Sequence, residues 1–164
     1  MKKALICGSF DPVTSGHASL IRRAARLFDE VEVVIFENSE KRYLFPLEAR
    51  LSFLQRVAAA CGENVRASAA AGTVAAYAKE NGFACILKGV RNANDLVYEQ
   101  DMAALNRLAG APETLFLPTE PSYAHVSSSA VREFLRHGLP AEELLPAEAC
   151  EEILATYRAL CKNT

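Results

Sequence analysis

The chain has 164 residues, a length typical of one compact domain, so we predict a single domain spanning residues 1–164. Hydrophobic residues make up 51% and charged residues 23% of the sequence, the usage of an ordinary globular protein, which excludes extensive disorder. Eighteen Lys and Arg against 20 Asp and Glu leave a formal net charge of −2, which argues against a general nucleic-acid binder.

The sequence shows no pattern typical of a membrane span, a secretion signal or a metal site. The longest apolar runs are far shorter than the ~20 residues that a membrane-spanning helix needs. Met1-Lys2-Lys3 is followed by too few apolar residues for a signal-peptide core. The five cysteines (7, 61, 85, 150 and 161) and three histidines (17, 125 and 137) lack metal-ligand spacing. We therefore expect a soluble, reduced, cytoplasmic protein without a membrane partner.

Short, nearly continuous apolar runs alternate with segments of helical periodicity along the chain. The runs predict strands at 4–7, 31–36, 64–67, 84–87 and 114–117. The periodic segments predict helices at 17–28, 47–61, 73–81, 95–108, 128–137 and 147–161. Strands that are apolar throughout are typical of parallel sheets covered on both faces. We therefore predict a doubly wound parallel α/β sheet with a helical C-terminal extension, and a ligand site beyond the carboxyl ends of its strands.

The first predicted strand leads into a helix through the segment Gly8 to His17. Gly8 lacks a side chain where another group can approach the backbone, and Thr14 or Ser15 can cap the helix. Gly16 and His17 then stand at the helix N-terminus, where free N–H groups and the helix dipole favour phosphate. A simple strand-to-helix turn with an incidental histidine explains the same residues, so this segment alone leaves both interpretations open.

Cations follow two other predicted strands. The segment Lys88-Gly89-Val90-Arg91 comes directly after one strand, and Lys41 follows another. Two cations around a glycine suit a polyphosphate, although a solvated basic loop has the same composition. Glu99, on the next predicted helix, can orient Arg91 or lie on the helix surface.

Three consecutive serines, Ser127 to Ser129, stand at the start of the helical pattern at 128–137. Capping explains one serine, and the others supply additional hydroxyl and N–H donors. Because the carboxyl ends of parallel strands meet at one edge of a sheet, we expect the four segments to lie together. The sequence therefore predicts a site that collects several phosphates.

The same segments resemble bacterial phosphopantetheine adenylyltransferases over nearly the whole chain. Thr14-Ser15-Gly16-His17 is similar to the T/H-x-G-H motif of the nucleotidyltransferase superfamily. The more specific similarity comes from 8–17, 88–91, Tyr98-Glu99 with Met102 and Asn106, and 126–133, in this order. The family transfers the adenylyl group of ATP to 4′-phosphopantetheine, giving dephospho-coenzyme A and pyrophosphate. The resemblance implies a Rossmann-like fold, Mg²⁺ as cofactor, a homohexamer and inhibition by coenzyme A.

The resemblance also implies the site residues. His17 is the implied catalytic residue, as the stabiliser of the transition state. The implied contacts of phosphopantetheine are Ser9, Lys41, Val74 and Lys88. Those of ATP are Ser9, Phe10, His17, Gly89, Val90, Arg91, Glu99, Tyr123, Ala124, His125, Val126, Ser127, Ser128 and Ser129. No side chain is implied as a metal ligand, since the nucleotide phosphates hold most of the Mg²⁺ coordination.

Two residues differ from the usual pattern of the family. Ser9 stands where Thr is frequent and keeps the hydroxyl, whereas Lys88 stands for Arg and loses the fork that grips phosphate bidentately. Two other interpretations stay open: a related nucleotidyltransferase that uses nicotinamide mononucleotide or a phosphorylated alcohol as acceptor, and a nucleotide-binding regulator without catalysis. The presence of both His17 and Arg91 argues against the regulator.

Overall fold

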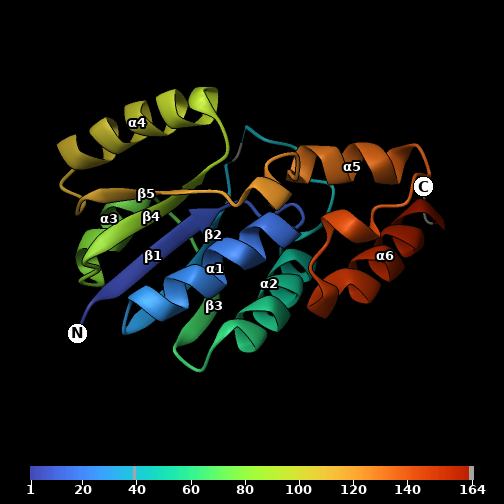
Figure 1. The fold of residues 1–164 in the computed structure, drawn as a ribbon, viewed down its shortest axis with the longest axis horizontal. Coiled ribbons are helices and arrows are strands. Elements are labelled where there is room, and N and C mark those ends of the chain that lie inside the picture. Colours follow the sequence, from blue (N-terminus) through green and yellow to red (C-terminus); the bar gives the residue numbers. More distant parts are fainter. Residues whose placement is uncertain (39, 163–164) are drawn as a thin grey trace.

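A single parallel sheet of five strands forms the centre of the molecule (Figure 1). The computed structural model describes residues 1–38 and 40–162. The strands are β1 (Lys3–Gly8), β2 (Glu30–Phe36), β3 (Val65–Ala70), β4 (Cys85–Val90) and β5 (Thr114–Pro118). Their order is β3-β2-β1-β4-β5, so the chain moves outward from β1 to β3 and then returns to β4 on the other side of β1. β1 and β4 are neighbours where the direction of winding reverses, and they pair through Ala4-Leu5 and Cys85-Ile86, before their carboxyl ends.

Helices cover both faces of this sheet. They are α1 (Ser15–Leu27), α2 (Leu47–Cys61), α3 (Val74–Glu80), α4 (Ala93–Leu108), α5 (Ser128–Arg136) and α6 (Ala147–Lys162), with short 3₁₀ helices η1 (Pro121–Tyr123) and η2 (Glu142–Leu144). Right-handed crossovers place α1 and α2 on one face and α3 and α4 on the other, because the winding direction reverses after β3. The terminal helix α6 packs on α2, beyond the sheet (Figure 1).

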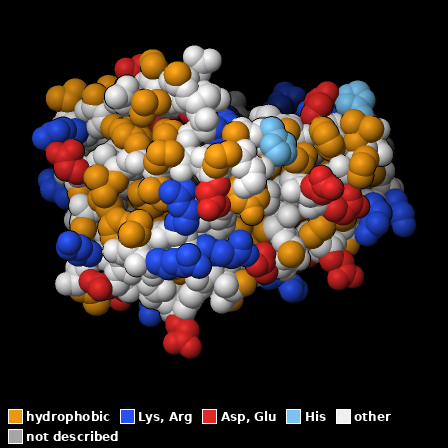
Figure 2. All heavy atoms as spheres, in the orientation of Figure 1, with side chains coloured by type: hydrophobic (Ala, Val, Ile, Leu, Met, Phe, Trp, Pro, Cys, Tyr) orange, Lys and Arg blue, Asp and Glu red, His pale blue; other side chains and the backbone are white. Residues whose placement is uncertain are grey.

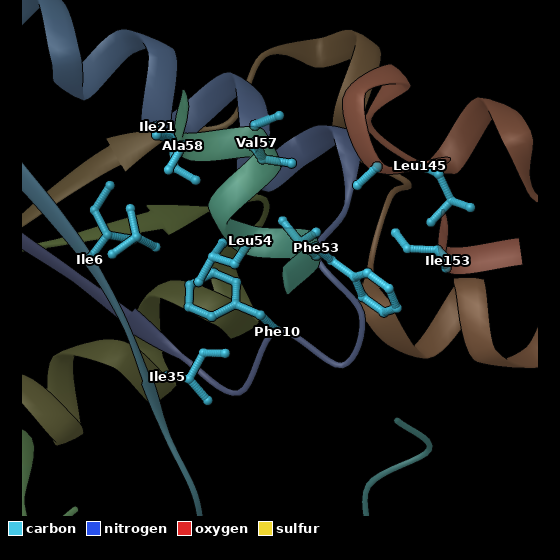
Figure 3. Close-up of a cluster of buried hydrophobic side chains, with 14 of the residues drawn as sticks. Ile6, Phe10, Ile21, Ile35, Phe53, Leu54, Val57, Ala58, Leu145 and Ile153 are labelled. Carbon is cyan, nitrogen blue, oxygen red and sulfur yellow. The ribbon is translucent and has the colours of Figure 1, made fainter. Parts of the chain in front are cut away.

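The larger part of the core lies between the sheet and helices α1, α2 and α6 (Figure 3). Ile6 and Ile35 from the sheet meet Ile21 of α1 and Leu54 of α2, and Ile153 brings α6 into the same cluster. A second, smaller cluster on the opposite face contains Leu5, Val34 and Ile86 together with residues around α3. Neighbouring strand residues enter different clusters because their side chains alternate across the sheet, so both faces are buried.

The predicted doubly wound sheet and the helical C-terminal extension are confirmed, and the differences lie at element ends. α1 begins at Ser15 rather than at residue 17 because the Thr14 side chain caps it, and Asn92 likewise starts α4 at Ala93. The prediction that Lys88 and its neighbours follow the strand is wrong. β4 continues to Val90 because residues 86–90 pair with β5. Within the described residues, every helix is too short or too polar to cross a bilayer.

Candidate active site

A cavity of about 390 Å³ opens at the carboxyl edge of the sheet, where β1 and β4 are neighbours. Ligands of open α/β sheets bind at this reversal of the winding, and the volume is typical of small-molecule sites (~300–1,000 Å³). The residues around it are Ile6, Cys7, Gly8, Phe10, Thr14, Gly16, His17, Leu20, Leu87, Lys88, Gly89, Arg91, Asp95, Tyr98, Glu99, Thr119, Tyr123, Val126, Ser127, Ser128 and Ser129. The segments that the sequence analysis singled out around Gly8, Lys88 and Ser127 thus meet at one cavity.

His17 is held at the N-terminus of α1 by a reciprocal cap with Thr14. The Thr14 side chain accepts the backbone N–H of His17 at 3.3 Å, and the Thr14 backbone N–H donates to His17 Nδ1 at 3.0 Å. A histidine thus occupies the position that Glu or Gln takes in a common capping box. Since Nδ1 accepts a hydrogen bond, the proton of the neutral ring lies on Nε2. The ring therefore offers one N–H donor at a helix terminus that already favours anions.

The surroundings of His17 keep its ring neutral. Burial lowers the pKa of His17 from its ordinary 6.5 to about 4, and the positive charges of Arg91 and Lys88 act in the same direction. At pH 7 a group with this pKa is protonated in only about 0.1% of molecules. His17 is consequently a hydrogen-bond donor through Nε2 and not a fixed cation.

The loop before α1 brings an aromatic ring against His17. The rings of Phe10 and His17 meet edge to face with their centroids 5.0 Å apart. Phe10 has φ of +44°, the one positive value among the described non-glycine residues, a conformation that costs about 1–3 kcal/mol. Gly8 permits this arrangement, because a Cβ at that position would lie only 3.3 Å from the Phe10 ring. The strained loop and the missing side chain together fix the ring that borders His17.

Helix α4 supplies a carboxylate to each cation of the cavity. Lys88 Nζ lies 3.3 Å from Glu99 Oε2 and also donates to the carbonyl of Cys7 at 3.4 Å. Burial alone lowers the pKa of Lys88, but Cys7 and Glu99 outweigh it and raise the pKa above the ordinary value, so the ammonium stays charged. The guanidinium of Arg91 is paired with Asp95. Two positive groups are thereby held at the carboxyl end of β4.

Each of the three serines at the start of α5 has a partner within the chain. Ser127 caps the helix by accepting the backbone N–H of Ala130, and the Ser128 hydroxyl donates to the Pro12 carbonyl at 2.8 Å. Ser129 accepts a hydrogen bond from Arg132. Capping thus accounts for one serine, Ser127, as expected, and the other two hydroxyls have hydrogen bonds of their own within the chain. The bond from Ser128 to Pro12 ties the serine segment to the loop before α1, and both border the cavity.

Comparison with known proteins identifies the family. Residues 5–134 match the cytidylyltransferase-like family. The phosphopantetheine adenylyltransferase of Symbiobacterium thermophilum is 48% identical over 147 residues, covering 89% of this chain and 90% of the relative. The enzyme of the same name from Arthrobacter sp. (strain FB24) is 39% identical over 155 residues, covering 94% and 98%. This chain belongs to the phosphopantetheine adenylyltransferase family. The family assignment and the expectation of a nucleotidyltransferase enzyme are confirmed.

The fold is shared more widely than the family. The nicotinic acid mononucleotide adenylyltransferase of Plasmodium falciparum superposes with a TM-score of 0.70 at 14% identity, covering 96% of this chain and 97% of that one. At such low identity the likeness shows a common nucleotidyltransferase architecture and nothing about the acceptor.

Eleven of the residues implied by membership of the phosphopantetheine adenylyltransferase family line the cavity. They are Phe10, His17, Lys88, Gly89, Arg91, Glu99, Tyr123, Val126, Ser127, Ser128 and Ser129. The cavity lining does not include Ser9, Lys41, Val74, Val90, Ala124 and His125. The first group is thus assembled by the fold, and the ligand contacts of both groups stay predictions.

Three implied contacts of phosphopantetheine lie outside the lining of the cavity, each in a different part of the fold: Ser9, Lys41 and Val74. The carbonyl of Ser9 accepts a hydrogen bond from Arg50, so its backbone is part of the loop framework. Lys41 is exposed in the loop after β2 and lies outside the lining of the cavity, so its contact with the acceptor stays a prediction. Val74 opens α3 and packs against the core cluster on the other face of the sheet.

Two buried charges that were not expected from the sequence hold the loops of the site. Arg50 is 1% exposed and donates to the carbonyls of Phe45 and Ser9 while pairing with Glu37. Asp11 is 3% exposed and accepts the backbone N–H groups of Leu44 and Phe45 at 2.8 and 2.9 Å. A signal for Arg50 was present: it occupies a position on the apolar stripe of α2, where a charge requires partners.

Proposed function

We propose that this protein transfers the adenylyl group of ATP to 4′-phosphopantetheine and releases pyrophosphate and dephospho-coenzyme A. An oxygen of the acceptor phosphate bonds to the α-phosphorus, and the bond from that phosphorus to the oxygen bridging to the β-phosphate breaks. The observation that carries the proposal is a neutral donor, His17, facing one cavity together with Lys88 and Arg91 in a chain of this family.

The proposed chemistry depends on position and charge. The acceptor phosphate is already anionic near neutral pH, so no general base is required, but two anionic substrates must be aligned. Alignment of two bound reactants can contribute about 7–11 kcal/mol. In this mechanism His17 Nε2–H donates to an oxygen of the α-phosphate, where negative charge increases in the transition state. Arg91 and the serine segment hold the β- and γ-phosphates, and Lys88 with Lys41 holds the acceptor phosphate.

The proposal includes Mg²⁺, held mainly by the nucleotide phosphates, as a charge shield for the leaving pyrophosphate. In its support, both carboxylates of the cavity, Asp95 and Glu99, are already paired with cations. The described residues contain no cluster of His, Cys, Asp and Glu fit to hold a metal. This is tested by measuring the activity while the concentrations of Mg²⁺ and ATP are varied independently. If the nucleotide phosphates hold the metal, the rate follows the concentration of the Mg–ATP complex.

The family also suggests a cytoplasmic homohexamer that coenzyme A inhibits, which we include in the proposal. In support of an assembly, α4 has no residue buried within the chain, and Val97, Leu105 and Leu108 on it are 59%, 59% and 86% exposed. Figure 2 shows hydrophobic side chains exposed over this helix, at the upper left. Sedimentation equilibrium gives the mass of the assembly, and coenzyme A added to the activity assay tests inhibition.

The first experiment measures Mg²⁺-dependent pyrophosphate release from ATP with three acceptors in parallel. They are 4′-phosphopantetheine, nicotinamide mononucleotide and glycerol 3-phosphate. Release with phosphopantetheine alone, with dephospho-coenzyme A as product, is the expected result. Release with another acceptor would keep the reaction class and reject the substrate, and ATP binding without release in any arm would favour the regulator.

Replacement of His17 by Ala tests the catalytic role directly. Loss of one preorganised donor to the developing charge lowers kcat by about 10²–10³-fold, with a much smaller rise in the KM for ATP. The matched control is His137→Ala, since His137 is exposed directly after α5 and pairs with Glu133 away from the cavity. An unchanged kcat in His17→Ala would exclude this role.

A further inference from the structure

Arg91 is held in one orientation by a carboxylate that the sequence analysis did not single out. Asp95 Oδ2 accepts Arg91 Nε at 2.8 Å, and Oδ1 accepts Nη2 at 3.1 Å, which makes a bidentate fork. Oδ2 also lies 3.2 Å from the backbone N of Arg91. These hydrogen bonds hold the pKa of Asp95 below its ordinary value, so the carboxylate is charged at neutral pH. The fork fixes both the plane and the direction of the guanidinium.

The remaining donors of Arg91 are divided between protein and cavity. Nη1 donates to the carbonyl of Val126, directly before the serine segment. Nε and one N–H of Nη2 are directed at Asp95. Among residues 1–38 and 40–162, one N–H on each terminal nitrogen then has no acceptor. Since Arg91 lines the cavity, these two groups are the ones available to a phosphate.

The contacts of Asp95, more than its position in the first turn of α4, indicate a task beyond the helix itself. Asn92 caps α4 and makes Asp95 the third helical residue, where a capping-box acid would bond back to the N–H of the cap residue. Its carboxylate instead reaches the backbone and guanidinium of Arg91. A negative charge beside a triphosphate site also opposes ATP binding by itself, so its presence there calls for a gain elsewhere.

We propose that Asp95 is a positioning residue for the adenylyl transfer: it preorganises Arg91 for the β- and γ-phosphates of ATP. This inference rests on the proposed function of the cavity and assigns a role to a residue outside the implied ATP contacts. Asp95 acts through Arg91 and makes no bond to the nucleotide. The gain from a preset guanidinium exceeds the repulsion between Asp95 and the phosphates.

The test is a double-mutant cycle with Asp95→Ala, Arg91→Ala and the double variant, with Asp95→Asn in addition. We expect Asp95→Ala to lower kcat/KM for ATP by about 10-fold to 100-fold, since misplacement of a positioning group by about 1 Å can cost about 100-fold. The KM for phosphopantetheine stays within about twofold, because Lys88 is held by Glu99 and not by Asp95. In the Arg91→Ala background, Asp95→Ala has no further effect. Asp29→Asn is the matched control, because Asp29 is exposed and lies outside the lining of the cavity.

Each result decides the inference. Tighter ATP binding by Asp95→Asn would mean that repulsion dominates, and additive losses in the cycle would mean that Asp95 acts independently of Arg91; both overturn it. The inference is also overturned if Asp95→Asn loses activity only because its Tm is lower, so that its kcat/KM at low temperature equals that of the wild type. A wild-type enzyme without transfer activity refutes the proposed function instead, and the same cycle is then measured as ATP affinity by calorimetry.

Discussion

The protonation state of His17 offers a direct test of the electrostatics of the site. The perturbation is the protonation of the His17 ring, which is monitored while the pH is lowered from 8 to 3.5. With a pKa of about 4, His17 is protonated in about 3% of folded molecules at pH 5.5, against about 90% for an ordinary histidine of pKa 6.5. The difference between these populations is large enough to see without fitting a full curve.

The measurement is a two-dimensional ¹H–¹⁵N spectrum of the histidine rings, with His17 assigned by its absence in His17→Gln. Below the midpoint both ring nitrogens carry protons, and above it the spectrum should show the Nε2–H tautomer, since the Thr14 N–H occupies Nδ1. Arg91→Met should raise the pKa of His17, because removal of a nearby positive charge makes the imidazolium less costly. The chain unfolded in urea supplies the reference titration.

The sign of the linked stability change follows from the same shift. The pKa of His17 is lower in the folded than in the unfolded chain, so the unfolded chain binds more protons between about pH 6.5 and 4. The stabilisation from keeping His17 neutral is complete above that window and is lost as the pH falls through it. A folded-state pKa at or above 6.5, or a proton on Nδ1 at pH 7, would refute the reasoning about burial and the cap.

Two further predictions concern a specificity residue and a buried carboxylate. Lys88→Arg should change the KM for phosphopantetheine while leaving the KM for ATP within about twofold. The reason is that a forked guanidinium replaces a point charge at the acceptor side of the cavity. Steady-state kinetics measure both constants, and a change in the KM for ATP alone contradicts the assignment of Lys88 to the acceptor. Asp11→Asn should destabilise the fold by about 2 kcal/mol, because an amide cannot accept both backbone N–H groups that Asp11 now satisfies. For a chain of this size, calorimetry should show a Tm lower by about 4–8 °C, with exposed Asp29→Asn as control; an equal Tm for both variants disproves the proposed dependence.

Local patterns in the sequence were sufficient for the fold. The apolar runs ending at Cys7 and Phe36 predicted strands buried on both faces, since only a doubly covered sheet buries successive side chains. Helix starts depend on one residue and the N–H groups just after it, so caps such as Thr14 and Ser127 were within reach of the sequence. Right-handed crossovers then decide which face of the sheet each helix covers, whereas the strand order β3-β2-β1-β4-β5 came only from the structure.

Partners distant in the chain were beyond such patterns. β4 extends through Lys88 because β5 pairs with it, and the Asp11 carboxylate finds its donors in Leu44 and Phe45, more than thirty positions away. The solitary positive charge of Arg50 on an apolar stripe signalled a buried partner without naming Ser9 or Glu37. Hydrogen bonds of this kind depend on distances that exist only after the sheet has assembled.

The sequence by itself determined which residues could bind phosphate, because residue type and position after a strand settle charge and donor capacity. Only the tertiary structure decided their state. Burial and two neighbouring cations make His17 neutral, its cap with Thr14 leaves the proton on Nε2, and α4 pairs Lys88 and Arg91 with separate carboxylates. Protonation and orientation depend on desolvation and on neighbours in space, which residue order does not specify.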